Sequence, residues 1–107
     1  MIINDYQVNG ITADKNTHGI KIVYDGLLSK SGADTVYAFY GYGDMWSNQS
    51  VQQMNRTING FETIIPTNTN VNYVNVAFKD SANNWDNNNY RNYSFVVDDV
   101  TTQSYFT

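Results

Sequence analysis

The sequence predicts an all-β protein, an antiparallel β-sandwich of six or seven short strands. Short runs rich in β-branched and aromatic residues recur along the chain, and turn-forming Asn, Asp and Gly separate them. No stretch has a convincing helical periodicity, so we expect no helix. At 107 residues the chain is one domain. Its core is expected over about 7–99, with 100–107 as a last strand or the remnant of a linker.

The first strands are predicted from alternation between apolar and polar residues. An early strand is expected over Gln7–Ala13, followed by the run Gly19–Leu28. In the second run Ile20, Ile22 and Tyr24 fall on one face. A strand has a side-chain period of two residues, so this face is expected to point into the core.

The middle strands are predicted from β-branched and aromatic residues and from one turn. Thr35–Tyr42 contains mostly such residues, and Gln53–Thr57 and Gly60–Pro66 are shorter candidates. The dipeptide Asn59-Gly60 separates the two short strands and is typical of a two-residue hairpin turn.

The last strands are Val71–Lys79 and Asn92–Asp98. In the first of them Val74, Val76 and Phe78 alternate with more polar residues and are expected to face the core. The Asn-rich segment between the two strands is predicted to be a long loop.

Charge and cysteine content exclude several classes of partner. Six basic and ten acidic residues give a net charge of −4, which argues against nucleic acid and against an anionic membrane surface. No apolar run approaches the roughly 20 residues that cross a bilayer. The absence of cysteine excludes disulfides and thiolate metal sites.

Neutral polar and aromatic residues dominate the composition instead. The chain has 16 Asn and 15% aromatic residues but only 15% charged residues. Amides beside flat apolar rings suit a neutral, polyhydroxylated ligand. The alternative is that the rings pack strands together and that Asn makes turns.

Catalytic and metal-binding patterns are lacking. His18 is the one histidine and is expected in a surface loop, and the acids are scattered over turn positions. The run that begins at Asp86 resembles a calcium loop, but Arg91 and Val97 occupy the positions that need Gly and Glu. A looser calcium site stays open. We expect no cofactor, no metal ligand and no catalytic residue.

The two tryptophans are the strongest candidates for a binding site. Trp46 lies in GYGDMWSNQ and Trp85 in SANNWDNNN, two polar segments. An exposed indole stacks on the CH-rich face of a pyranose, while amides bond its hydroxyls. The alternative is that each Trp covers its own end of the core. The nearby amides are Asn48, Gln49, Asn83, Asn84, Asn87, Asn88 and Asn89.

Two segments together resemble the starch-binding carbohydrate-binding modules of family 25 and the closely related family 53. One is VNVAFKDSANNWDNNNYRNYSF, and the other is GLLSKSGADTVYAFYGYGDMW followed by VQQM. The resemblance covers about Val23 to Val97, with both tryptophans in register.

This resemblance implies an immunoglobulin-like β-sandwich that binds α-1,4-glucans such as starch, glycogen and maltooligosaccharides without catalysis. Trp46 and Trp85 would form the sugar platform, and Asn87 and Asn88 would bond glucose hydroxyls. Such a module is expected to be monomeric, tethered to a secreted amylase and extracellular. The alternative is a standalone chain in the cytoplasm.

Two positions depart from the family pattern. Phe39 stands where members often carry a sugar-binding His, and Tyr90 stands where they usually have Gly. Both remain candidate ligand contacts, since aromatic rings stack on sugars. Two other function classes stay open, namely an immunoglobulin- or fibronectin-like protein-interaction module and a small enzyme.

Overall fold

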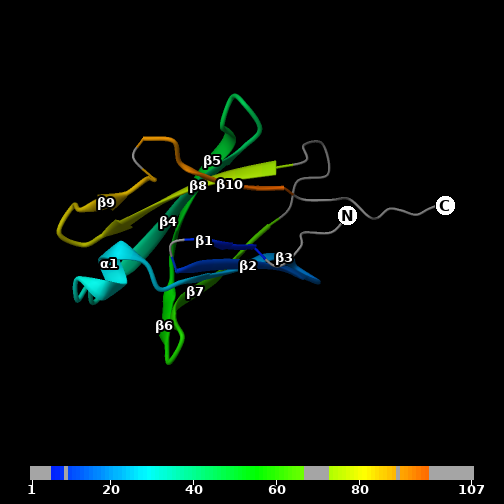
Figure 1. Cartoon of the computed structure of the whole chain (residues 1–107). Coiled ribbons are helices and arrows are strands. Elements are labelled where there is room, and N and C mark those ends of the chain that lie inside the picture. Colours follow the sequence, from blue (N-terminus) through cyan, green and yellow to red (C-terminus); the bar gives the residue numbers. More distant parts are fainter. Residues whose placement is uncertain (1–5, 9, 67–72, 89, 97–107) are drawn as a thin grey trace.

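Two antiparallel sheets form the protein in the computed structural model, which describes residues 6–8, 10–66, 73–88 and 90–96 (Figure 1). The first sheet has the order β1-β2-β3-β7-β6. Its strands are β1 (Tyr6–Val8), β2 (Ile11–Asn16), β3 (Gly19–Tyr24), β7 (Gly60–Ile65) and β6 (Asn55–Thr57). The second sheet has the order β10-β8-β4-β5, and β9 also pairs with β8. Its strands are β10 (Tyr93–Val96), β8 (Tyr73–Asp80), β4 (Val36–Tyr42), β5 (Ser47–Gln53) and β9 (Trp85–Asp86).

The strand connectivity is that of an immunoglobulin domain. β2, β3, β7 and β6 take the order of strands A, B, E and D. β10, β8 and β4 take the order of strands G, F and C, with β5 added beside β4. The predicted fold class, an antiparallel immunoglobulin-like β-sandwich, is therefore confirmed.

The core lies between the two sheets and follows the predicted alternation. Ile20, Ile22 and Tyr24 of β3 are buried, as are Val74, Val76 and Phe78 of β8. The rings of Tyr24 and Phe78 stack across the core with centroids 4.2 Å apart. Each such buried side chain contributes roughly 1.5–3 kcal/mol to folding.

The N-terminal prediction of one strand over Gln7–Ala13 is wrong, because β1 and β2 are two strands of a hairpin. Gly10 makes the turn with φ +83°, and a Cβ there would lie 2.3 Å from the carbonyl oxygen of Asp25. The amide of Asp25 also donates to the Gly10 carbonyl at 2.9 Å.

The expectation of no helix is also wrong. β3 ends at Tyr24, and the short helix α1 (Leu27–Lys30) follows it. The hydroxyl of Tyr24, a core residue, accepts a hydrogen bond from the Leu28 amide at 3.0 Å. This bond holds the helical turn in place. A single turn is too short to give a helical periodicity. Among the described residues no helix is long and apolar enough to span a bilayer.

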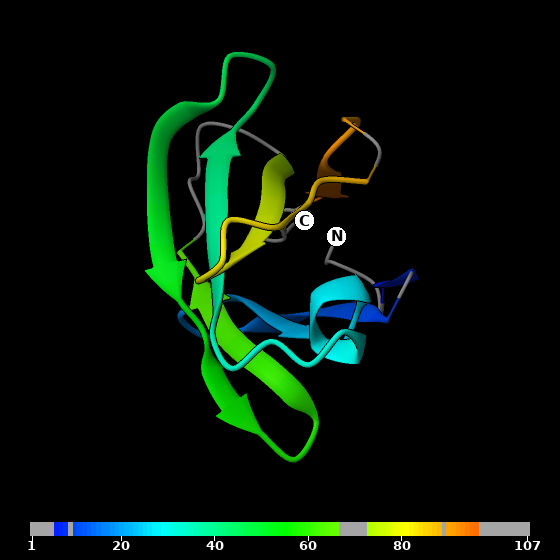
Figure 2. The same cartoon turned by 90° about the vertical axis from the view of Figure 1, so that its left-hand side faces the viewer.

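The middle of the chain crosses from one sheet to the other. β5 belongs to the second sheet and β6 to the first, and buried Met54 lies between them (Figure 2). The prediction of one strand over Gln53–Thr57 therefore missed most of β5, whose exposed residues show no apolar alternation. The predicted hairpin is confirmed, with Thr57 paired to Gly60.

The C-terminal strands are β8 and β10, close to their predicted ranges. The segment between them is not only a loop, since it contains the two-residue strand β9. The expected last strand or linker at 100–107 lies outside the described residues.

Candidate functional site

A shallow hollow of about 640 Å³ opens on the second sheet. It is called the aromatic hollow here, and its lining combines four aromatic rings, two amides and one small apolar side chain. The lining residues are Phe39, Trp46, Ala77, Trp85, Asn87, Tyr90 and Asn92. None of these side chains is charged, which distinguishes the hollow from the rest of an acidic protein.

The floor comes from the outward positions of β4 and β8. Phe39 and Ala77 are directly opposed in the antiparallel register, and their neighbours Ala38, Tyr40, Val76 and Phe78 face the core. Ala77 is small, so the sheet is recessed between the larger rings around it.

Trp85 is placed by a hairpin that Asp80 holds closed. The Asp80 carboxylate accepts hydrogen bonds from the amides of Ala82 at 2.9 Å and Asn84 at 2.8 Å, and from Asn84 Nδ2 at 2.9 Å. These bonds, those of Asn84 first, lower the pKa of Asp80. The hairpin presents Trp85, 45% exposed, with its ring centroid 4.9 Å from that of Phe39 and tilted by 47°.

The residue after Trp85 ties β9 to both sheets. Asp86 is buried, and its carboxylate accepts hydrogen bonds from the hydroxyls of Tyr24 at 2.6 Å and Tyr93 at 2.8 Å. Burial first, and then the bond to Asp86, raises the pKa of Tyr24 far above its usual value. Since successive side chains of a strand point to opposite faces, fixing Asp86 inward turns Trp85 outward.

Trp46 lies in the turn between β4 and β5 and packs on a glycine. Its amide donates to the Gly43 carbonyl at 3.2 Å, and a buried amide, Asn75 Nδ2, donates to the same carbonyl at 2.8 Å. A Cβ on Gly41 would lie 2.7 Å from Trp46 Cε3, so the indole contacts the bare backbone there. Trp46 is half-buried and keeps part of its surface in the hollow.

The loop from β9 to β10 adds the polar part of the lining. Asn87 Oδ1 accepts a hydrogen bond from the Tyr90 amide at 3.0 Å, and the Asn87 carbonyl accepts one from the Asn92 amide at 2.7 Å. Within the described part of the chain, no contact engages Asn87 Nδ2 or the Asn92 side chain. Both amides therefore remain available for a ligand.

Backbone strain is concentrated at the aromatic hollow. Six described non-glycine residues have positive φ, and four of them are Asn, which tolerates this region. The other two are Trp46 at +51° and Tyr90 at +70°. A bulky residue in this conformation costs on the order of 1 kcal/mol or more and is maintained only where the surroundings fix it.

Five of the six predicted ligand contacts line the same hollow, and Asn88 is the exception. Phe39, Trp46, Trp85, Asn87 and Tyr90 come together there. The Asn88 amide instead donates to the Asn92 carbonyl at 3.1 Å, and the residue lines a different hollow.

Sequence reasoning did not single out two lining residues, Ala77 and Asn92. Ala77 is an outward position of a predicted strand, and Asn92 belongs to the Asn-rich segment that was predicted around Trp85. The outward alternation of β8 could have indicated Ala77, but only the loop geometry brings Asn92 to the site.

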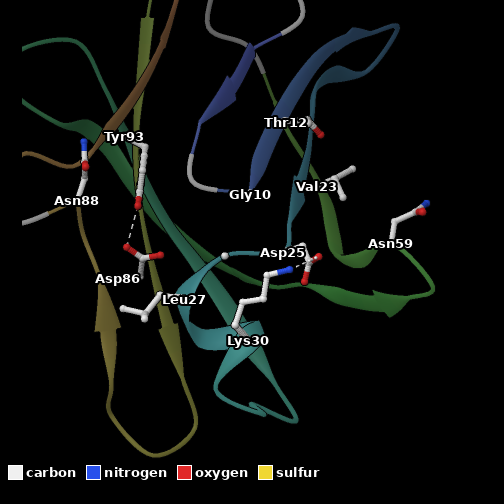
Figure 3. A pocket seen from close by; sticks show the side chains of 11 residues that line it. Gly10, Thr12, Val23, Asp25, Leu27, Lys30, Asn59, Asp86, Asn88 and Tyr93 are labelled. Atoms are coloured by element: carbon white, nitrogen blue, oxygen red, sulfur yellow. Dashed lines mark hydrogen bonds and ion pairs between the residues drawn. The ribbon is translucent and has the colours of Figure 1, made fainter.

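A second hollow, called the charged hollow here, has about 720 Å³ and lies at the end of the molecule near α1 (Figure 3). Its lining includes Asp25 and Lys30, which form an exposed ion pair at 3.0 Å, and buried Asp86. Hydrogen bonds from Ser29 and then Lys30 lower the pKa of Asp25. Asp25 and Lys30 thus satisfy each other, and Asp86 is satisfied by two tyrosine hydroxyls.

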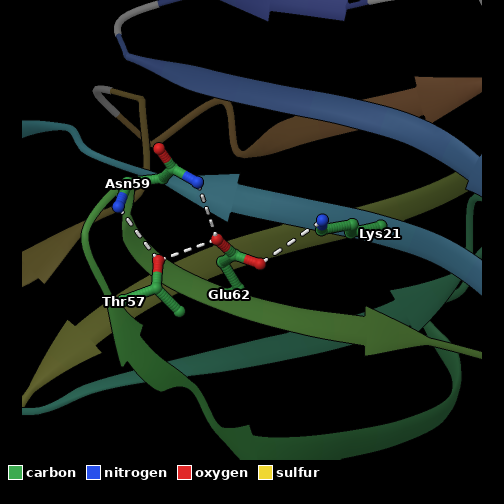
Figure 4. A network of polar contacts seen from close by, with 4 residues as sticks. All are labelled: Lys21, Thr57, Asn59 and Glu62. Carbon is green, nitrogen blue, oxygen red and sulfur yellow. Dashed lines mark hydrogen bonds and ion pairs between the residues drawn. The ribbon is translucent and has the colours of Figure 1, made fainter.

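A polar network of four side chains, Lys21, Thr57, Asn59 and Glu62, lies on the outer face of the first sheet (Figure 4). The Glu62 carboxylate accepts hydrogen bonds from the Thr57 hydroxyl at 2.7 Å and Asn59 Nδ2 at 3.3 Å, and pairs with Lys21 at 3.4 Å. The Thr57 bond is the main reason why the pKa of Glu62 is lowered.

No cluster of three or more His, Asp or Glu side chains suited to a metal ion occurs in the described ranges. His18 is exposed in the turn between β2 and β3, as predicted. The calcium interpretation relied on Asp86, but both of its oxygens accept tyrosine hydroxyls.

Comparison with protein-family models, with curated proteins and with solved structures finds no match. The fold class is therefore established by strand connectivity, and the chemistry of the hollow is the guide to function.

Proposed function

We propose that the protein is a non-catalytic module that binds α-1,4-glucans, such as starch, glycogen and maltooligosaccharides, in the aromatic hollow. The observation that carries this proposal is the lining itself, which offers four aromatic rings, two amides and no charge. Neutral sugars present CH-rich faces for stacking and hydroxyls for hydrogen bonds, so the two surfaces are complementary. The α-1,4 linkage is inferred from the sequence resemblance.

The mechanism is stacking with orientation by amides. Trp85 presents its exposed face, Trp46 the uncovered part of its ring, and each stack contributes on the order of 1 kcal/mol beyond area burial. Asn87 Nδ2 and the Asn92 amide bond sugar hydroxyls, at about 1 kcal/mol each. A shallow site of this kind binds a single chain at roughly micromolar to millimolar Kd. Tethering to an amylase-type enzyme would add avidity.

The lining supplied by the described residues contains no carboxylate, which favours binding over hydrolysis. A glycosidase needs two carboxyl groups across the sugar, and none of the seven lining residues supplies one. The protein is therefore expected to generate no reducing ends from soluble starch.

The test is a tryptophan-fluorescence titration of the native protein with maltoheptaose, with cellohexaose as the matched β-linked sugar. We expect a saturable change with maltoheptaose and a much weaker response to cellohexaose, together with retardation in starch-containing native gels. If maltoheptaose gives no response and starch gives no retardation, the glucan proposal fails, and the protein-interaction module becomes the better hypothesis. Release of reducing ends would favour the enzyme class.

A further inference from the structure

Tyr90 combines high exposure with a position beside the proposed ligand. Its side chain is 90% exposed and lines the aromatic hollow with Trp85 and Asn87. An aromatic ring left in water offers a large area for burial by a ligand. By contrast, Met45, which precedes Trp46 in the chain and is 84% exposed, does not line the hollow.

The Tyr90 backbone adopts a conformation that suits glycine or asparagine. Its φ of +70° places it in the left-handed region, where a bulky side chain is strained. Such strain marks positions where the side chain has a use other than stability. At this loop position a smaller residue would satisfy the fold better than tyrosine does.

The loop is held by contacts that do not involve the Tyr90 ring. Asn87 Oδ1 accepts the Tyr90 amide, the Asn87 carbonyl accepts the Asn92 amide, and Asn88 Nδ2 donates to the Asn92 carbonyl. These bonds come from backbone groups and from other side chains. Replacement of the ring is therefore expected to leave the loop in place.

We propose that Tyr90 is a ligand-contacting residue that closes one side of the aromatic hollow and determines how tightly a glucan is retained. The inference rests on the proposed function, and it assigns to this side chain a role in affinity and none in folding. The phenyl face supplies the contact. The hydroxyl is not required, because stacking on the CH-rich face of a sugar uses the face of the ring.

The experiment compares maltoheptaose affinity and melting temperature in Tyr90→Asn, Tyr90→Phe and Trp85→Ala. Asn tolerates positive φ without a ring, and Phe keeps the ring without the hydroxyl. We expect Tyr90→Asn to weaken binding about tenfold with an unchanged or higher melting temperature, and Tyr90→Phe to bind within about twofold of the native protein.

The outcomes separate this inference from the proposed function. If Trp85→Ala loses affinity while Tyr90→Asn binds like the native protein, the Tyr90 inference is overturned and glucan binding stands. If Tyr90→Asn melts several degrees lower, the ring is structural and the inference is also overturned. If the native protein does not bind maltoheptaose, both proposals fail.

Discussion

The outer faces of the two sheets differ in whether their outward side chains have partners within the protein. On the first sheet the Glu62 carboxylate is occupied by Lys21, Thr57 and Asn59, so its polar groups satisfy one another. On the second sheet, rings such as Trp85 remain exposed and the Asn87 amide keeps a free donor among the described residues. A ligand site in this fold therefore requires outward-facing groups that have no partner within the protein.

Trp85→Ala is expected to cause the largest loss of ligand affinity at the second sheet. Loss of the exposed indole removes a stacking face and its buried area in the complex, so affinity for maltoheptaose should fall about 10- to 100-fold. Isothermal titration calorimetry measures it. The matched control is Ile58→Ala, a fully exposed apolar residue at the tip of the first-sheet hairpin, which should bind like the native protein.

Asp80→Ala should weaken binding at the same site, although Asp80 does not line the aromatic hollow. It removes three hydrogen bonds that close the hairpin before Trp85, so we expect a lower free energy of unfolding and weaker binding. Denaturant unfolding and calorimetry measure the two effects. Ser81→Ala, at the exposed neighbouring position, is the control. Unchanged affinity in folded Asp80→Ala would contradict the positioning role of the hairpin.

Gly41→Ala should weaken the second tryptophan contact. The added Cβ would lie 2.7 Å from Trp46 Cε3 and 3.0 Å from its Cβ, so the indole must shift. We expect affinity to fall about three- to tenfold and the Trp46 indole NMR signal to move. In Gly32→Ala no heavy atom lies within 4 Å of the added Cβ, but φ is +90°, so this control should lower stability and leave affinity unchanged. A Trp46 signal that stays in place in Gly41→Ala would refute this packing.

Lowering the pH should reduce the stability of the fold more than it changes the affinity for the sugar. Hydrogen bonds hold the pKa of Asp80 and Asp25 below the ordinary 3.8, and that of Glu62 below 4.5. These depressed values add stability that is complete above about pH 5 and is lost as the pH falls below 4 through the folded-state values. Melting temperature should therefore drop below pH 4, and less steeply in Asp80→Asn.

Between pH 5 and 8 the maltoheptaose affinity should stay constant, because the described residues that line the aromatic hollow include no carboxyl or imidazole. A steep affinity change in this range, at constant folded fraction, would show that a titrating group takes part in binding. Calorimetric titrations at several pH values measure it.

The smallest effect is expected from Glu62→Gln on the opposite face. The change removes an ion pair in which the Lys21 side chain is partly exposed, so stability should fall by less than about 1 kcal/mol. Affinity for maltoheptaose should stay within twofold of the native value. A larger loss of affinity would indicate that the first sheet, rather than the second, contacts the sugar.

The core could be predicted from sequence because burial imposes a period of two. Alternation places Ile20, Ile22 and Tyr24 on one face of the strand, and all three side chains are buried in the core. β5 could not be predicted this way, since an exposed edge strand carries no apolar alternation. α1 was missed because its turn depends on a hydroxyl from the core, Tyr24, which local sequence does not reveal.

The candidate site could be predicted in part. Trp85 and Asn87 stand out as a ring and an amide in one polar segment. The different direction of Asn88 depends on its φ of +56° and on the Asn92 carbonyl that it bonds. The conformation of the loop backbone determines which of the two neighbouring amides lines the hollow, and the amino-acid composition does not specify that conformation.

Mapping of NMR signal changes on addition of maltoheptaose tests most directly whether the second sheet carries the site. If the second sheet binds the sugar, we expect saturable shifts at the Trp46 and Trp85 indoles and at the Asn87 amide. Signals of Lys21 and Glu62 on the first sheet should stay in place. Shifts confined to the first sheet, or none at saturating sugar, would contradict binding at the second sheet.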